Sequence, residues 1–154
     1  MGKKVLLAKP NYSKYSPTGY KMLADKGYEL KEIPFDRDYT LEELMQVVGD
    51  IDGVIADSEP WCEEAFRAAP SLKVVARYGS GMNSVDVEAA KRHHVTVTNC
   101  PGVNASAVAE HAVALLLCAL RDLANLNEST KQGKWKQFIF HELAGATVGI
   151  LGFG

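Results

Sequence analysis

Short apolar runs recur at intervals of about 20 to 25 residues along the first hundred residues, and this spacing narrows the possible folds more than any other feature. The predicted strands are Val5–Ala8, Tyr28–Ile33, Val54–Ala56, Val74–Ala76 and Val95–Thr98. Segments with helical spacing alternate with them, and the predicted helices are Thr18–Lys26, Leu41–Val48, Trp61–Ala69 and Val87–His93. Such alternation favours an α/β fold, with a doubly wound parallel sheet that carries helices on both faces.

Two of these helices have recognisable start signals. Thr40, followed three residues later by Glu43, predicts a capping box before the helix that begins at Leu41. Pro60 predicts the first turn of the next helix, because proline is well tolerated where the backbone N–H has no helical partner.

The pattern changes near residue 100, where Asn99-Cys100-Pro101-Gly102 interrupts the chain. A single long helix is predicted over Ser106–Asn127, with Asn104 or Ser106 as its N-cap. We therefore predict a domain boundary that separates residues 1–103 from residues 104–154. The broadly apolar surface of the long helix favours contact with a second copy of the chain, and we expect a homodimer through this helix and the second domain.

The composition excludes several classes of protein. Hydrophobic residues make up 47% of the chain, charged residues 23%, and the formal net charge is −2, which disfavours nucleic-acid or anionic-membrane surfaces. Cys62, Cys100 and Cys118 are far apart and show no metal-ligand spacing, so no metal site is expected and a reducing compartment is favoured. The longest apolar run, Ala112–Leu120, is shorter than a membrane span, so we expect a cytoplasmic protein.

The last residues point to a nucleotide. Thr147–Leu151 is a β-branched and apolar run that predicts a buried strand, and Gly152-Phe153-Gly154 follows it. A strand that runs into a Gly-x-Gly turn is typical of dinucleotide-binding folds, in which the glycines let the backbone approach a pyrophosphate. Gly-x-Gly alone is a weak signal, and the cofactor loop of methyltransferases also contains it.

Residues with possible ligand chemistry follow the third, fourth and fifth predicted strands, where ligands bind in open α/β sheets, and the segment after the fifth strand is Asn99–Asn104. The two glycines of Gly79-Ser80-Gly81 allow successive N–H groups to form an anion-binding nest, although a plain turn explains them as well. Asp57, Ser58 and Glu59 could bond ligand hydroxyls or cap a helix. Arg77 could pair with an anion or be a solvated strand end.

Three segments together resemble one family, the NAD-dependent D-isomer-specific 2-hydroxyacid dehydrogenases, and within it the phosphoglycerate dehydrogenase-like branch. They are Leu72–Gly81, Asn99–Glu110 and Leu143–Gly154. The resemblance implies a flavodoxin-like substrate (catalytic) domain followed by the first helix and strand of a Rossmann domain that binds NAD. It implies an oxidoreductase that transfers hydride between NAD(H) and a D-2-hydroxy or 2-keto acid, with 3-phosphoglycerate-like acids among the candidates.

The resemblance also assigns residues to the site. For the substrate they are Ser58, Glu59, Tyr78, Gly79, Ser80 and Gly81. For the cofactor they are Ser80, Asn104, Val108, Gly152 and Gly154. The family's catalytic Arg, Glu and His follow the matched segments, so no catalytic residue is assigned within residues 1–154, and the chain alone is expected to be inactive.

Two positions depart from the family pattern. Asn83-Ser84 stands where the family usually has Asp-Asn, and Asp57 stands where many phosphoglycerate-specific relatives carry an arginine. An aspartate would repel a phosphate, which argues against a phosphorylated substrate. A non-catalytic module that binds a small acid, or that regulates a partner, remains the alternative function.

Overall fold

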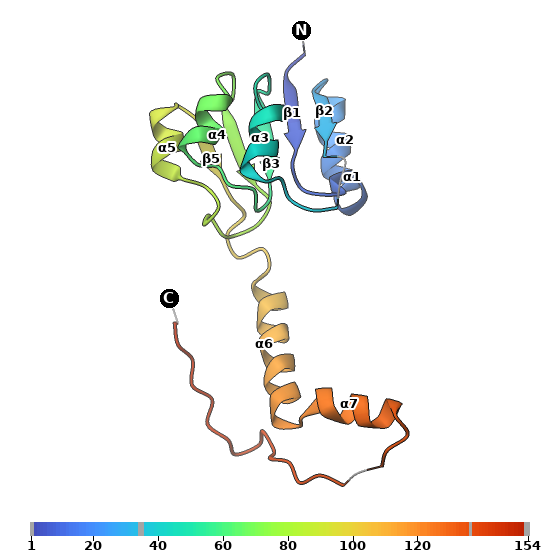
Figure 1. Cartoon of the computed structure of the whole chain (residues 1–154). Helices are drawn as coiled ribbons and strands as arrows, with labels where there is room; N and C mark the ends of the chain where they lie inside the picture. The colour runs from blue at the N-terminus through green and yellow to red at the C-terminus, as the bar shows by residue number, and fades with distance from the viewer. Residues whose placement is uncertain (1, 34–35, 136, 153–154) are drawn as a thin grey trace. The chain divides into compact units, whose positions relative to one another are not determined.

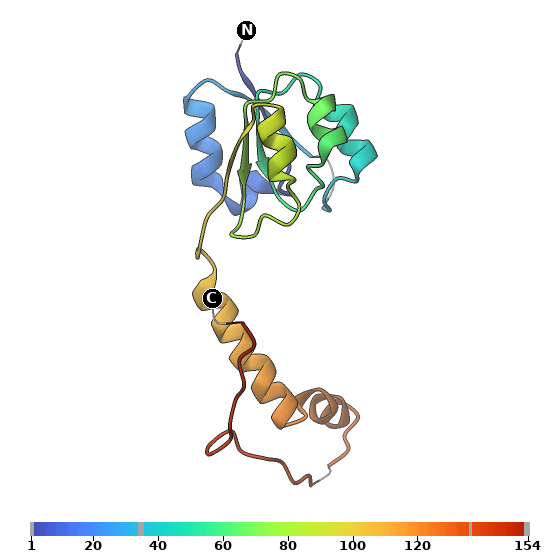
Figure 2. The same cartoon turned by 90° about the vertical axis from the view of Figure 1, so that its left-hand side faces the viewer.

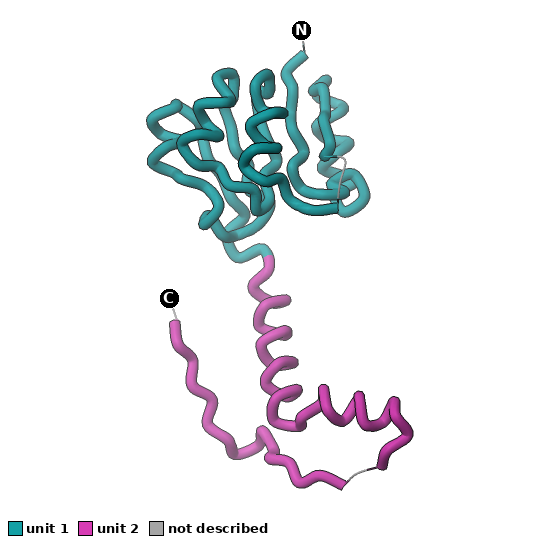
Figure 3. Tube along the Cα trace, viewed as in Figure 1, with its two compact units in different colours: residues 1–103 teal, residues 104–154 magenta. Residues whose placement is uncertain are grey.

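The computed structural model describes residues 2–33, 36–135 and 137–152. It divides into two compact units, residues 1–103 and residues 104–154 (Figure 3). We call them the first and the second unit and describe each by itself.

The first unit is built on a parallel sheet, which has five strands within the described residues. The strands are β1 (Lys4–Leu7), β2 (Glu29–Glu32), β3 (Gly53–Ala56), β4 (Val74–Arg77) and β5 (Thr96–Thr98). They lie in the order β2-β1-β3-β4-β5, and all neighbours are parallel (Figure 1). This is the flavodoxin-like strand order, so the predicted α/β doubly wound sheet is confirmed.

Helices cover the sheet on both faces (Figure 2). They are α1 (Tyr12–Tyr15), α2 (Pro17–Asp25), α3 (Leu41–Val47), α4 (Glu63–Ala68) and α5 (Val87–Arg92). The larger core lies under α3, α4 and α5, where Trp61, Phe66 and Leu44 are at most 1% exposed. A smaller core around Leu7 and Tyr12 lies on the face that α1 and α2 cover. Burial from both faces explains why the strands are short apolar runs.

Side-chain caps fix two of the helix starts, one of which the sequence predicts. Thr40 Oγ1 accepts the Glu43 N–H at 3.3 Å, and Glu43 Oε2 accepts the Thr40 N–H at 3.0 Å, so the predicted capping box is confirmed. Asp86 Oδ1 accepts the Ala89 N–H at 2.9 Å and caps α5 in the same way.

The prediction that a helix starts at Pro60 is wrong, because α4 begins only at Glu63 with Cys62 at its N-cap. Trp61 instead forms a parallel bridge with Val85, which joins the loop after β3 to the loop after β4. The backbone of Trp61 is bonded across the loops, so it cannot also begin a helix. The short helix α1 was not predicted.

Among its described residues, the second unit contains two helices in place of the predicted single one. They are α6 (Ala105–Leu120) and α7 (Leu123–Lys131). Asp122 lies between them in the left-handed conformation, with φ of 46°, which a continuous α-helix cannot contain. Asn104 occupies the N-cap of α6, but its side chain makes no capping hydrogen bond within the described part of the chain.

The strand predicted over Thr147–Leu151 is also wrong. These residues are described, and none of them lies in a strand. A strand needs a neighbour for its backbone hydrogen bonds, and no described segment of residues 104–152 pairs with this one. No helix among the described residues is long and apolar enough to cross a membrane.

Candidate functional site

The candidate site is the edge of the sheet at which the strands end. All strands of the sheet are parallel, so the loops after β1, β3, β4 and β5 meet at this edge. In open α/β sheets ligands bind there, outside the carboxyl ends of the strands. These loops carry Lys9, Asp57, Tyr78–Gly81 and Asn99–Cys100 respectively.

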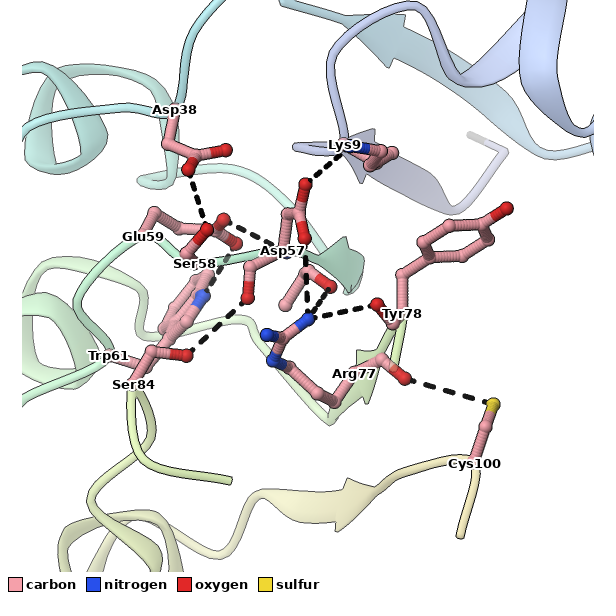
Figure 4. Close-up of polar contacts among 11 residues, drawn as sticks. Lys9, Asp38, Asp57, Ser58, Glu59, Trp61, Arg77, Tyr78, Ser84 and Cys100 are labelled. Carbon is pink, nitrogen blue, oxygen red and sulfur yellow. Dashed lines mark hydrogen bonds and ion pairs between the residues drawn. The ribbon is translucent and has the colours of Figure 1, made fainter. Parts of the chain in front are cut away.

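A chain of charges links three adjacent strands at this edge (Figure 4). Lys9 Nζ lies 2.8 Å from Asp57 Oδ2, and Arg77 Nη1 lies 3.4 Å from Asp57 Oδ1. The hydrogen bond to Asp57 raises the pKa of Lys9, so the lysine stays charged. We refer to Lys9, Asp57 and Arg77 as the charge chain.

Arg77 connects the charge chain to the glycine-containing loop. Its Nη1 donates to the carbonyl oxygen of Tyr78 at 2.9 Å and lies 3.5 Å from that of Ala56. The Arg77 side chain is only 14% exposed, and its buried Nε has no hydrogen-bond partner among the described residues. A guanidinium held in this way has little freedom to move unless its acceptors change.

Two carbonyl oxygens of the Tyr78–Gly81 loop accept hydrogen bonds from the residues that follow β5. The Cys100 N–H donates to Gly79 O at 2.9 Å, and Asn99 Nδ2 donates to Ser80 O at 2.7 Å. All peptide bonds that the structure describes are trans, so each N–H points opposite to the carbonyl of its own peptide unit. The Ser80 and Gly81 N–H groups therefore point away from Asn99 and Cys100. This orientation suits an anion nest.

The two glycines of this loop differ in whether the structure requires a glycine at that position. Gly79 has φ of 150°, a backbone conformation that favours glycine, whereas a Cβ there would only make an ordinary contact with Arg77 Nη1 at 3.4 Å. Gly81 has no such constraint: a Cβ built there meets no described atom within 4 Å. The space beside Gly81 is open to a ligand.

Two further residues assigned to the substrate lie close to the charge chain. The ring of Tyr78 is 40% exposed and packs edge-on against Tyr12, with 5.8 Å between ring centroids. Ser58 Oγ donates to Asp38 Oδ2 at 2.6 Å (Figure 4). Both side chains belong to the edge where the sequence placed them.

Glu59 is not exposed at the edge of the sheet, as a residue that binds substrate would need to be. Its side chain is fully buried, where Oε2 accepts the Asp57 N–H at 2.9 Å and Oε1 accepts the Trp61 Nε1–H at 3.0 Å. Burial raises the pKa of Glu59. The carboxylate therefore braces the loop after β3 from inside, with no surface left for a ligand.

A cleft of about 710 Å³ opens between the ends of β1 and β3. These two strands are neighbours in space but not in sequence, which is the position where flavodoxin-like sheets bind ligands. Its charged lining is balanced in sign: Lys9, Lys14, Arg37, Asp36, Asp38 and Asp57. A cleft of this kind offers polar contacts without a surplus of positive charge.

The residues assigned to the cofactor are divided between the units. Ser80 lies in the loop just described, whereas Asn104 and Val108 lie at the start of α6, where Val108 is 57% exposed. Gly152 has φ of 86°, and a Cβ on it meets no described atom within 4 Å. A left-handed, uncovered glycine is what a pyrophosphate-binding turn needs. Gly154 lies outside the described residues.

Within residues 2–33, 36–135 and 137–152, no group of three or more His, Cys, Asp or Glu residues could hold a metal ion.

A comparison with protein families decides the relationship. Residues 6–150 match the model of the D-isomer specific 2-hydroxyacid dehydrogenase catalytic domain. The chain belongs to this family. The predicted resemblance to D-isomer-specific 2-hydroxyacid dehydrogenases is thereby confirmed.

Individual members of the family span more than this chain. The chain is 36% identical to the glyoxylate reductase of Pyrococcus furiosus, with 88% of this chain and 43% of that protein covered. It is 38% identical to the D-3-phosphoglycerate dehydrogenase of Rattus norvegicus, with 90% and 26% covered. The NAD+-bound 3-phosphoglycerate dehydrogenase of Entamoeba histolytica is similar in structure, with TM-score 0.68, 26% identity, and 79% and 40% covered. The chain thus spans less than half the length of these 2-hydroxyacid dehydrogenases.

Reasoning from the sequence missed Lys9 as a contributor to the site, whereas Asn99 lies in the segment Asn99–Asn104 that the sequence already indicated. Lys9 directly follows the first apolar run, so it also stands at the carboxyl end of a predicted strand. That position was a usable signal, since parallel strands bring all such ends to one edge.

Proposed function

We propose that this chain is the substrate-binding part of an NAD-dependent 2-hydroxyacid dehydrogenase. Residues 1–103 form its substrate domain, and residues 104–154 begin its cofactor domain. The whole enzyme transfers hydride between the nicotinamide and C2 of a 2-hydroxy or 2-keto acid. Membership of the family supports the reaction class.

The observation that carries this proposal is the geometry of the loop after β4. The carbonyl oxygens of Gly79 and Ser80 accept hydrogen bonds from the Cys100 N–H and from Asn99 Nδ2 respectively, so the Ser80 and Gly81 N–H groups point away from these two donors. Backbone N–H groups bind a carboxylate well, because charge-assisted hydrogen bonds are among the stronger ones in proteins. The N–H groups of Ser80 and Gly81 would hold the substrate carboxylate, and the open space beside Gly81 would admit it.

Gly152 fits the dinucleotide, since its left-handed backbone and open surroundings would let a pyrophosphate approach closely. When bound, NAD(H) supplies or accepts the hydride. Asn104, Val108 and Ser80 would contribute further contacts to the cofactor. The residues of this chain bind and orient the acid, and proton transfer falls to groups outside them.

The substrate is proposed to be an unphosphorylated acid. The two cations at the strand ends, Lys9 and Arg77, share the single carboxylate of Asp57, so the three residues together carry a net charge of only +1 towards a phosphate dianion. The balanced cleft between β1 and β3 suits hydroxyl groups better than a phosphate. Glyoxylate or hydroxypyruvate would meet this requirement.

Replacing Gly81 by valine tests the carboxylate assignment. In the wild-type chain, titration with glyoxylate is expected to shift the Ser80 and Gly81 amide resonances in ¹⁵N–¹H spectra. Gly81→Val should weaken binding by about tenfold or more, because its side chain fills the space in front of these amides while the fold is retained.

Gly149→Val serves as the matched control, since a Cβ on Gly149 also meets no described atom within 4 Å and that residue lies outside the loop. It should leave glyoxylate binding unchanged. Wild-type spectra that do not respond to glyoxylate, hydroxypyruvate or 3-phosphoglycerate would reject the assignment. Tighter binding of 3-phosphoglycerate than of glyoxylate would reject the unphosphorylated substrate.

We also propose that α6 pairs with a second copy of the chain. None of its residues is buried, and Val113 and Leu117 are 51% and 39% exposed along a shallow apolar groove that includes Ala109 and Ala114. Exposed apolar surfaces of this kind are typical of interfaces, and two-fold dimers are the commonest assemblies. Val113→Glu should convert a dimer into a monomer in sedimentation velocity, whereas Ser129→Glu on the polar helix α7 should not. A monomeric wild type at high concentration would disprove the pairing.

A further inference from the structure

We propose that Asp57 is a positioning residue: through Arg77 it fixes the conformation of the loop whose N–H groups bind the substrate carboxylate. Asp57 does not touch the substrate, and its main effect is not to repel a phosphate. The link to substrate binding rests on the function proposed above, whereas the link between Asp57 and the loop does not.

Burial makes the charge chain strong enough for this role. The side chains of Asp57, Arg77 and Lys9 are 17%, 14% and 28% exposed. Charges that are largely removed from water interact more strongly than pairs on the surface. Lys9 and Asp57 follow β1 and β3, and Arg77 is the last residue of the adjacent strand β4, so the charge chain also connects the strand ends that frame the site.

Asp57 itself is held at its backbone, so its carboxylate is a fixed reference point. Its N–H donates to Glu59 Oε2 at 2.9 Å, and its carbonyl oxygen lies 3.4 Å from the Ser84 hydroxyl (Figure 4). The fixed Asp57 carboxylate can therefore determine where the Arg77 side chain of β4 lies.

Arg77 links Asp57 to the loop after β4. The same nitrogen, Nη1, approaches Asp57 Oδ1 and donates to the carbonyl oxygen of Tyr78. The guanidinium also packs against Gly79, where a Cβ would lie 3.4 Å from Nη1. Loss of the Asp57 charge would leave a mostly buried guanidinium without its carboxylate, and the guanidinium would rotate towards other acceptors. The peptide between Tyr78 and Gly79 would lose its donor and its packing partner together.

Asp36 provides a matched comparison within the same cleft. It lines the cleft with Asp57 and carries the same charge, but its Oδ1 accepts a hydrogen bond from Asn11 Nδ2 at 2.6 Å. No hydrogen bond or ion pair joins it to Arg77 among the described residues. Asp36→Asn and Asp57→Asn therefore remove the same charge from one cleft. An effect of overall charge would appear in both variants, and an effect of positioning only in the second.

The test compares Asp57→Asn, Asp57→Glu and Asp36→Asn in the 154-residue chain. Without ligand, Asp57→Asn should shift the amide resonances of Tyr78, Gly79, Ser80 and Gly81, and Asp36→Asn should leave them in place. Glyoxylate and 3-phosphoglycerate should both bind roughly tenfold more weakly to Asp57→Asn. Asp57→Glu, which keeps a carboxylate within reach of Lys9 and Arg77, should restore most of the binding.

If Asp57→Asn proves too unstable, Arg77→Lys should give the same loop shifts, because the lysine side chain is one bond shorter and its Nζ falls short of the position from which Arg77 Nη1 contacts Asp57 and Tyr78 O. Unchanged loop resonances in either variant would overturn the proposal. So would tighter 3-phosphoglycerate binding by Asp57→Asn, which indicates simple repulsion. A wild type that binds no acid would reject the proposed function alone, since the ligand-free spectra still measure positioning.

Discussion

Replacing Trp61 by alanine is expected to destabilise the first unit by about 3–5 kcal/mol, the cost typical of removing a buried tryptophan. The indole is fully buried against Phe66, with 5.5 Å between ring centroids. Its Nε1–H also donates to Glu59, so the alanine variant leaves both a cavity and a carboxylate with one donor fewer.

Trp135 offers the control, because its side chain is 98% exposed. Trp135→Ala should change the free energy of unfolding by less than about 0.5 kcal/mol. Urea denaturation followed by circular dichroism measures both variants without relying on tryptophan fluorescence. Equal stabilities of the two variants would mean that burial of the Trp61 indole does not stabilise the first unit.

Replacing Glu59 by alanine is the second change expected to have a large effect. It leaves the Asp57 N–H and the Trp61 Nε1–H without their acceptor, at a cost of about 1–3 kcal/mol for each buried donor. The loop that carries Asp57 should loosen as well. Chemical denaturation at neutral pH measures the loss in the free energy of unfolding. Glu88→Ala is the comparison, because Glu88 forms an exposed ion pair with Lys91.

The pH dependence of Glu59→Gln tests the cause of the shifted pKa. Burial holds the pKa of Glu59 above its ordinary value of 4.5, so the folded state favours the protonated acid. That contribution to stability is complete below pH 4.5 and is lost as the pH rises through the folded-state pKa. Wild type should therefore lose stability relative to Glu59→Gln as the pH rises over this window. The opposite trend would mean that the two N–H donors outweigh burial.

The strands of the first unit could be predicted from the sequence because a local signal is enough for them. Val54–Ala56 and Val74–Ala76 are apolar runs with charged or turn residues on either side, and a strand buried on both faces needs little more. Trp61 was wrongly predicted to lie in a helix, because an apolar residue just before a helix can fit the helical spacing of the apolar residues that follow it. Only its long-range bridge to Val85 distinguishes the two, and no local pattern records such a bridge.

The site was predictable in part for the same reason. Gly79 and Gly81 are conspicuous in a sequence, since glycine pairs after a strand suggest an unusual backbone. The groups that orient them depend on contacts between neighbouring strand ends: Asn99 donates to Ser80 O, and Arg77 approaches Asp57 Oδ1. In the second unit, Thr147–Leu151 shows the converse limit: a run with strand character forms no strand when no neighbour lies beside it.

The proposed carboxylate contacts belong to the main chain, and this affects how such a site can change over evolutionary time. Replacing the side chain of Ser80 or Tyr78 would alter what surrounds the rest of the acid without removing the groups that hold its common end. New substrates could then be acquired by single substitutions, provided that Gly79 and the residues that hold its loop are retained. The framework that fixes the backbone would be inherited as a unit, while the surface around it stays free to vary.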